Sequence, residues 1–323
     1  MRLRVSLAGS VTAALISMNA SAQAGCGQVT ITEMNWASGA VVTAVSSFLL
    51  EQGYGCQVQK VPTSTVPALT SLAETGKPDI LTEIWPAVAD VYFSLEKQGK
   101  LVKVGNVLSD GGQDGWWVPR YLVEQHPEAA TLAGLMAHPE WVGGQFNNGP
   151  SGWGGRVSSD NLIKAFELEQ HGIKVFNHGS GETLAASLAS AYESKKPWFG
   201  YYWAPTGLLG KYPMVSVDMG PVDADKAKCN ARIDCPTPGK TSWPTAAVLT
   251  TMSRAFHDGH PEIVALMSKV SFTNTQMGEL LAWQESNKAT ADETAAYFLT
   301  RHKDVWHTWV SDEAGSKLDA IIQ

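Results

Sequence analysis

The sequence predicts an α/β protein of two lobes, each a mainly parallel sheet flanked by helices, with a ligand site in the cleft between the lobes. The first observation is that apolar strand-like runs alternate with helical segments after residue 28, the order expected of a parallel sheet covered by helices. The second is the length of 323 residues, which is enough for two domains. The third is a glycine-rich break at residues 111–115, where we expect the chain to cross into the second lobe.

Residues 1–24 have the features of a secretory signal peptide. Arg2 and Arg4 precede a short apolar stretch at residues 7–18, and Ala22-Gln23-Ala24 is a small-x-small cleavage site. No later run of 18 or more apolar residues is present, so no other segment is expected to span a membrane. We therefore expect a periplasmic protein that is exported through a cleavable signal peptide.

Four cysteines in an exported chain indicate two disulfides. Cys26 and Cys56 each precede an apolar run, and neighbouring parallel strands would bring them to one edge of a sheet. Cys229 and Cys235 bracket a short polar loop that a disulfide can close. A metal site is the competing interpretation, but no paired C-x-x-C is present and we expect no metal. A lipid anchor on Cys26 is a further alternative, although Gln23 stands where a lipobox has an aliphatic residue.

The first lobe is expected to begin with residues 25–114. Its pattern alternates between apolar strand-like runs and apolar positions at helical spacing. Gly53-Tyr54-Gly55 is typical of the end of a helix. Strands are expected at residues 29–34, 57–61 and 79–84, and helices at residues 40–52 and 66–75.

The second lobe is expected over residues 115–214. Its strands are predicted at residues 173–177 and 198–203, and its helices at residues 159–170 and 182–194. Residues 215–323 are expected to return to the first lobe and to be largely helical beyond Trp243-Pro244, which makes the first lobe discontinuous.

Four tryptophans stand at predicted strand ends, each beside glycine, proline or the start of a helix. In open α/β sheets, ligands bind at such strand ends. An indole face attracts a cation that has no N–H to donate, so several converging faces form a cage for a quaternary ammonium group. Ordinary core packing is the alternative for any one of them. The four cage candidates are Trp36, Trp85, Trp153 and Trp203.

The polar end of this site is less clearly marked. The backbone N–H groups of Gly154 and Gly155 precede a predicted helix, whose N-terminus favours an anion such as a carboxylate. A tight turn with a solvated Arg156 is the alternative. Further candidate ligand residues are Glu33, Glu83, Trp116 and Tyr201, and strand alternation puts Tyr201 on the same side as Trp203.

Several classes of function are disfavoured. The formal net charge of −7 does not suit nucleic acid or an anionic membrane. No G-x-S-x-G, H-E-x-x-H, P-loop or G-x-G-x-x-G motif is present, so we expect neither an enzyme nor a cofactor. Asp223, Asp225 and Asp234 could form a calcium-type oxygen site, but their spacing matches no calcium loop.

Three motifs resemble the glycine betaine, proline betaine and choline substrate-binding proteins of bacterial ABC importers. They are Ile84-Trp85-Pro86, Gly152-Trp153-Gly154-Gly155 and Gly200-Tyr201-Tyr202-Trp203-Ala204-Pro205, and they occur in the family's order. The resemblance implies a periplasmic-binding-protein fold, similar to type II, whose tryptophan box holds a trimethylammonium head. It also implies a membrane permease as partner. We expect a monomer.

Individual residues carry the resemblance further. In the box of the betaine binders the matching residues are Trp85, Trp153 and Trp203, and Trp36 matches an extra cage residue of the choline binders. Gly154 and Gly155 match the positions whose backbone amides hold a carboxylate.

Two departures from the family leave the polar end of the ligand open. The betaine binders have a histidine where this chain has Ala89, and the choline binders have an acidic residue where this chain has Ser38. Glycine betaine, choline or a close relative is the expected ligand, with trimethylamine N-oxide or dimethylsulfoniopropionate as alternatives. A tryptophan-platform carbohydrate binder or a glycosidase is the alternative from another class.

Overall fold

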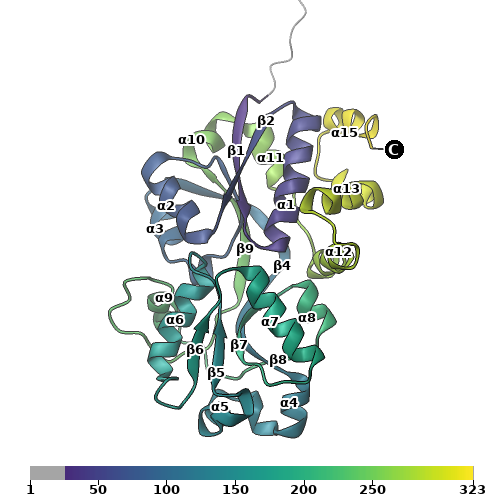
Figure 1. Ribbon diagram of the computed structural model, residues 1–323. Helices are drawn as coiled ribbons and strands as arrows, with labels where there is room; N and C mark the ends of the chain where they lie inside the picture. The colour runs from purple at the N-terminus through teal and green to yellow at the C-terminus, as the bar shows by residue number, and fades with distance from the viewer. Residues whose placement is uncertain (1–25, 323) are drawn as a thin grey trace, which may run out of the picture.

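The computed structural model describes residues 26–322 and has two lobes, one above the other in Figure 1. The predicted signal peptide and its cleavage site lie outside the described residues. No helix within 26–322 combines the length and the apolar character needed to cross a bilayer. The α/β class and the two-lobed architecture are as predicted.

The upper lobe contains a five-stranded mixed sheet in the order β2-β1-β3-β9-β4. β1 pairs in parallel with β2 and β3, whereas β9 is antiparallel to both β3 and β4. The strands are β1 (Gln28–Met34), β2 (Gln57–Thr63), β3 (Ile80–Ile84), β4 (Leu101–Pro119) and β9 (Ala246–Ser253). The helices are α1 (Ala37–Phe48), α2 (Thr65–Thr75), α3 (Val91–Lys97), α10 (Arg254–Gly259), α11 (Pro261–Met267), α12 (Asn274–Asn287), α13 (Ala291–Arg301), α14 (Lys303–Trp306) and α15 (Asp312–Asp319).

The lower lobe has its own mixed sheet, to which β4 also contributes. β5 pairs in parallel with β6 and β7, and the end of β4 runs antiparallel to β7 and β8. The strands are β5 (Gln145–Asn148), β6 (Lys174–Asn177), β7 (Gly200–Ala204) and β8 (Met214–Ser216). The helices are α4 (Arg120–Gln125), α5 (Leu132–Ala137), α6 (Gly154–Phe166), α7 (Gly181–Glu193), α8 (Gly207–Lys211) and α9 (Ala224–Asn230).

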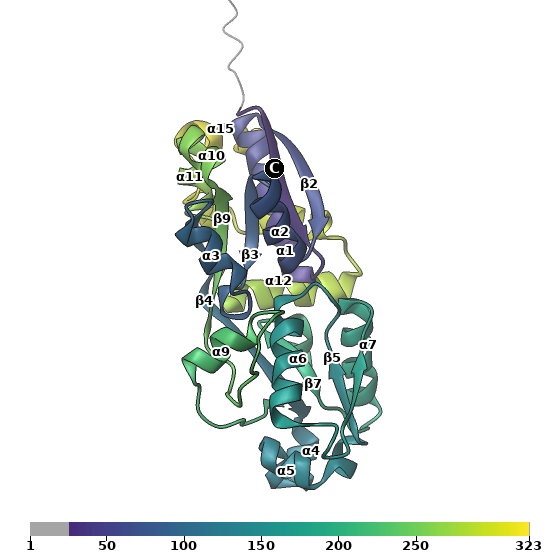
Figure 2. The same ribbon diagram turned by 90° about the vertical axis from the view of Figure 1, so that its left-hand side faces the viewer.

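Two segments of chain join the lobes: β4, and the stretch that leads from α9 back into β9. β4 is 19 residues long and pairs with β9 in the upper lobe and with β7 and β8 in the lower one. Figure 2 shows β4 and β9 on the same side of the molecule, with α12 at the boundary between the lobes. The glycine-rich break predicted at residues 111–115 lies within β4, where its partner changes from β9 to β7.

Three details differ from the sequence expectations. The lobes' sheets are mixed rather than mainly parallel, because β4 and β9 run against their neighbours. β4 and β9 were not predicted: β4 is rich in glycine, and β9 is buried along nearly its whole length and so lacks polar alternation. β8 and α9 lie with the lower lobe, so we propose that the chain returns between α9 and β9, later than residue 215.

Both predicted disulfides are present. Cys26–Cys56 joins the chain just before β1 to the chain just before β2, which the parallel register Gln28↔Gln57 places side by side. Cys229–Cys235 closes the loop that follows α9. The first therefore ties the start of the described chain to the sheet, and the second restrains a loop of the lower lobe.

Candidate ligand-binding site

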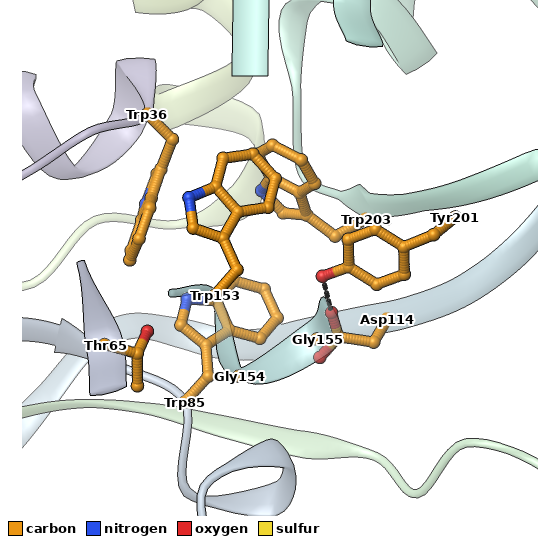
Figure 3. A pocket seen from close by; sticks show the side chains of 9 residues that line it. All are labelled: Trp36, Thr65, Trp85, Asp114, Trp153, Gly154, Gly155, Tyr201 and Trp203. Atoms are coloured by element: carbon orange, nitrogen blue, oxygen red, sulfur yellow. Dashed lines mark hydrogen bonds between the residues drawn. The ribbon is translucent and has the colours of Figure 1, made fainter. Parts of the chain in front are cut away.

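The four predicted tryptophans surround one cavity between the lobes (Figure 3). Trp36 immediately precedes α1 and Trp85 immediately follows β3 in the upper lobe, while Trp153 immediately precedes α6 and Trp203 lies in β7 of the lower lobe. The cavity holds about 310 Å³ of empty space and is partly open to solvent. Part of this space is open solvent, so the enclosed cavity is small and suits a small ligand.

Three of the indole rings meet edge to face. The Trp36 and Trp153 ring centroids are 5.8 Å apart with planes at 82°, and those of Trp153 and Trp203 are 5.0 Å apart at 90°. Perpendicular neighbours make corners, so the faces look onto the cavity from different directions. Such an arrangement can surround the N-methyl groups of a quaternary ammonium ion.

Gly112 of β4 allows Trp85 to take its place in the cage. A β-carbon at residue 112 would collide with the six-membered ring of Trp85. The Trp85 indole therefore lies directly against the β4 backbone, and two residues further along that strand Asp114 also lines the cavity. Because side chains on a strand alternate, residues 112 and 114 share one face of β4.

Glu83 does not line the cavity but anchors its wall. Its Oε1 accepts hydrogen bonds from Trp36 Nε1 and Ser38 Oγ, both at 2.7 Å. Burial raises the pKa of this carboxyl to about 7, although hydrogen bonds from Ser38, Trp36 and Trp85 oppose the rise. The backbone φ of Glu83 is 53°, which is unusual for a residue other than glycine. Glu83 lies within an irregular part of β3. Glu83 thus holds the upper-lobe tryptophans in position from behind.

Trp153 is held by a bond that crosses the cleft. Its Nε1 donates to Asn35 Oδ1 of the upper lobe at 2.7 Å. Nearby, the backbone N–H of Val66 in α2 donates to the Gly152 carbonyl at 3.1 Å. The lobes are therefore in direct contact at the cage, as in a closed state.

Asp114 and Tyr201 form a polar pair in the cavity wall. The Tyr201 hydroxyl donates to Asp114 Oδ1 at 2.6 Å (Figure 3), whereas Asp114 Oδ2 is buried without a hydrogen-bond partner among the described residues. Burial raises the pKa of Asp114 to about 7, and the Tyr201 hydrogen bond opposes that rise. Burial, followed by the charge of Asp114, raises the pKa of Tyr201. The sequence did not indicate Asp114, since its strand was not predicted; Thr65 is a further lining residue that was missed.

Gly154 and Gly155 form the first turn of α6 and line the cavity. The first N–H groups of a helix have no partner within it, so these two are available to a ligand. A β-carbon at residue 155 would collide with the Tyr201 hydroxyl, which explains why glycine is needed there. Arg156 does not face the cavity's polar end: its Nε donates to Asp160 Oδ1 at 2.7 Å and its Nη1 to the Gly149 carbonyl.

Two other candidate residues lie outside the cavity. Glu33 is partly exposed on β1 and lies 4.0 Å from Lys60 of β2. Trp116 is fully buried, and its Nε1 donates to Ser159 Oγ of α6 at 3.0 Å. Trp116 shares a face of β4 with Asp114 but lies one step further from the cleft, where α6 covers it.

Two of the three aspartates considered for calcium have other partners. Asp223 caps α9 and pairs with Lys226, and Asp234 pairs with Arg232. Within residues 26–322, no group of three or more histidine, cysteine or acidic side chains is placed to hold a metal ion.

Comparison with known proteins gives consistent matches. The family described as the substrate binding domain of the ABC-type glycine betaine transport system matches residues 27–301. The trimethylamine N-oxide-binding protein of Pelagibacter ubique (strain HTCC1062) is 24% identical over 296 residues, covering 86% of this chain and 89% of that protein.

Solved structures show the same fold. An ABC-transporter choline binding protein in complex with choline has a TM-score of 0.75 at 18% identity, covering 92% of this chain and 99% of its own. Lactococcal OpuAC, in its closed conformation complexed with glycine betaine, has a TM-score of 0.69 at 18% identity. The match covers 88% of this chain and 100% of that chain.

Proposed function

Since this chain belongs to the family of substrate-binding domains of ABC-type glycine betaine transport systems, we propose that its tryptophan cage binds a small quaternary ammonium compound for import. Members of this family are transport receptors rather than enzymes, and they work with ABC permeases. The proposed ligand is glycine betaine, choline or a close relative. Trimethylamine N-oxide and dimethylsulfoniopropionate are alternatives of similar shape, the first of them supported by the Pelagibacter relative.

One observation carries this proposal: indoles from both lobes converge on a small cavity that no basic side chain of residues 26–322 is seen to line. The proposed ligand-binding residues are Trp36, Trp85, Trp153, Trp203, Gly154 and Gly155, with Tyr201 as a further wall. Each indole face supplies roughly 0.5–2 kcal/mol to a caged cation, so four supply on the order of 2–8 kcal/mol. Micromolar affinity corresponds to about 8 kcal/mol, so burial of N-methyl groups and a polar contact must add to the cage.

The carbohydrate alternative requires polar groups around a sugar ring, and a glycosidase requires two carboxylates facing the substrate. Asp114 lines the cavity, but Glu83 is behind the cage with one oxygen bonded to Trp36 and Ser38. The lining therefore suits N-methyl groups better than the ring of hydroxyl groups on a sugar.

We also propose that the protein acts outside the cytoplasm, as a monomer, after loss of its signal peptide. The two disulfides support this, because disulfides persist in oxidising compartments.

A calorimetric binding panel tests the proposed function. Choline, glycine betaine, carnitine, trimethylamine N-oxide, dimethylsulfoniopropionate and neutral sugars are titrated into the purified protein. At least one methylated ammonium or sulfonium compound should bind, and the Trp85→Ala variant should bind it at least about tenfold more weakly. Trp141→Ala is the matched control, since Trp141 is stacked between His126 and His138 outside the cavity. Binding of sugars alone, or equal affinity in Trp85→Ala, would contradict the proposal.

A further inference from the structure

Among the described residues, Asp114 is the one side chain lining the cavity that can carry a full charge near neutral pH. It is 4% exposed, its Oδ1 accepts from Tyr201, and its Oδ2 has no partner among the described residues. Within the described part of the chain, no lysine, arginine or histidine lines the cavity to balance it. A buried carboxylate without a positive partner is costly, so an ionised Asp114 needs a cation that arrives from outside.

The described neighbours of Asp114 in the cavity wall add no positive charge. Tyr201 of β7 is its titratable partner, Gly155 of α6 has no side chain, and the lining residue after β3 is the neutral Trp85. The second buried carboxyl near the cage, Glu83, is itself acidic and is bonded to Trp36 and Ser38. Among the described residues, the ionisable groups that the cage contacts are therefore acidic rather than basic.

We propose that Asp114 determines specificity by acting as the counter-charge for the caged ammonium, so that the receptor selects net cations ending in a hydroxyl over zwitterions ending in a carboxylate. This inference rests on the proposed function of the same cavity. The quaternary nitrogen sits among the indoles, and the unpartnered Asp114 Oδ2 accepts the ligand's hydroxyl hydrogen. An opposite charge nearby favours the ionised form of a carboxyl, so binding of such a ligand lowers the pKa of Asp114 and releases a proton.

A carboxylate-bearing ligand meets the reverse situation. The N-terminus of α6 could attract its carboxylate, but at Gly155 this helix end already faces the Tyr201 hydroxyl that is bonded to Asp114. A ligand carboxylate placed there lies close to a like charge unless Asp114 is protonated. Zwitterions with an acceptor oxygen therefore bind the acid form of Asp114, and their affinity falls as the pH rises.

The test is calorimetric titration with choline and glycine betaine at pH 5, 6, 7 and 8. Because burial raises the pKa of Asp114 to about 7, choline affinity should rise by up to about tenfold per pH unit below pH 7 and then level off. Glycine betaine should show no such rise. In Asp114→Asn, choline binding at pH 8 should be at least about tenfold weaker, glycine betaine binding should be equal or tighter, and the pH dependence for choline should disappear.

Two further variants make the outcome specific to Asp114. Asp110→Asn removes an exposed carboxylate from the same strand and should leave both affinities and the pH profile unchanged. Tyr201→Phe removes the hydrogen bond that favours ionised Asp114, so the choline profile should shift to higher pH while the preference for choline persists.

Unchanged choline affinity in a folded Asp114→Asn protein would overturn the inference. A pH dependence of choline binding that survives this substitution would also overturn it, since the titrating group would then be Glu83. If neither choline nor any other methylated compound binds the wild type, the proposed function itself fails. If the wild type binds but Asp114→Asn does not change the preference, only the role of Asp114 fails.

Discussion

Trp153 has two separable contributions to binding, and substitutions can distinguish them. Its ring forms a wall of the cage, and its Nε1 donates across the cleft to Asn35 Oδ1 at 2.7 Å. Trp153→Phe keeps an aromatic face and removes the hydrogen bond, whereas Asn35→Ala removes the bond and keeps the indole. Trp153→Ala removes both.

The expected magnitudes follow from these contacts. A hydrogen bond contributes about 0.5–1.5 kcal/mol net, so Trp153→Phe and Asn35→Ala should each weaken binding by roughly 2- to 12-fold. Loss of a cation–π face adds about 0.5–2 kcal/mol, so Trp153→Ala should weaken binding by roughly 5- to 400-fold. The double variant Asn35→Ala/Trp153→Phe should be no weaker than the single variants, because both remove the same bond.

Calorimetric titration with the best-binding methylated amine from the panel measures all four variants, with Trp141→Ala as the control outside the cage. Additive losses in the double variant would show that Asn35 and Trp153 act independently. Wild-type affinity in Trp153→Ala would refute the cage itself.

Three other predictions test whether Trp85 belongs to the cage or to the core, whether Asp114 is protonated in the folded protein, and whether the lobes open and close. Trp116→Ala should lower the free energy of unfolding by on the order of 3–5 kcal/mol in urea titrations, whereas Trp85→Ala should mainly weaken binding; equal destabilisation by both would argue that Trp85 is a core residue. In the ligand-free protein, the pKa of Asp114 is raised from 3.8 to about 7, so the folded state holds this proton more tightly than the unfolded state. The stabilising contribution of this bound proton is complete below about pH 4 and declines by on the order of 4 kcal/mol as the pH rises to about 7. In urea titrations, the free energy of unfolding should therefore decline less with pH in Asp114→Asn than in the wild type. Parallel pH dependences in the two proteins would contradict this prediction. Because the cage draws on both lobes, small-angle scattering should show a smaller radius of gyration at ligand saturation, and no change would indicate that the lobes do not open.

The alternation of strands and helices predicted most elements of the parallel part of each sheet, because each of those elements has a local pattern. The tryptophans of the cage were also recognisable locally, since each stands beside glycine, proline or a helix start. Cys26 and Cys56 could be paired because parallel neighbours align their strand ends, and Cys229 and Cys235 because they bracket one short loop. In these cases the sequence signal and the structural feature involve the same few residues.

Other features depend on segments far apart in the chain, and only the tertiary structure reveals them. β9 lies between β3 and β4 inside the sheet and is buried on both faces, so its sequence lacks the polar alternation of a half-exposed strand. Asp114 became a cavity residue because β4 passes beside β7 and places it against Tyr201, 87 residues away. Trp116, two residues further along, is covered by α6 instead. The sequence determined that a tryptophan cage would exist, because indoles at strand ends are a local feature. The fold decided which carboxyl lines it, because burial and distance between remote strands set the charge that a ligand meets.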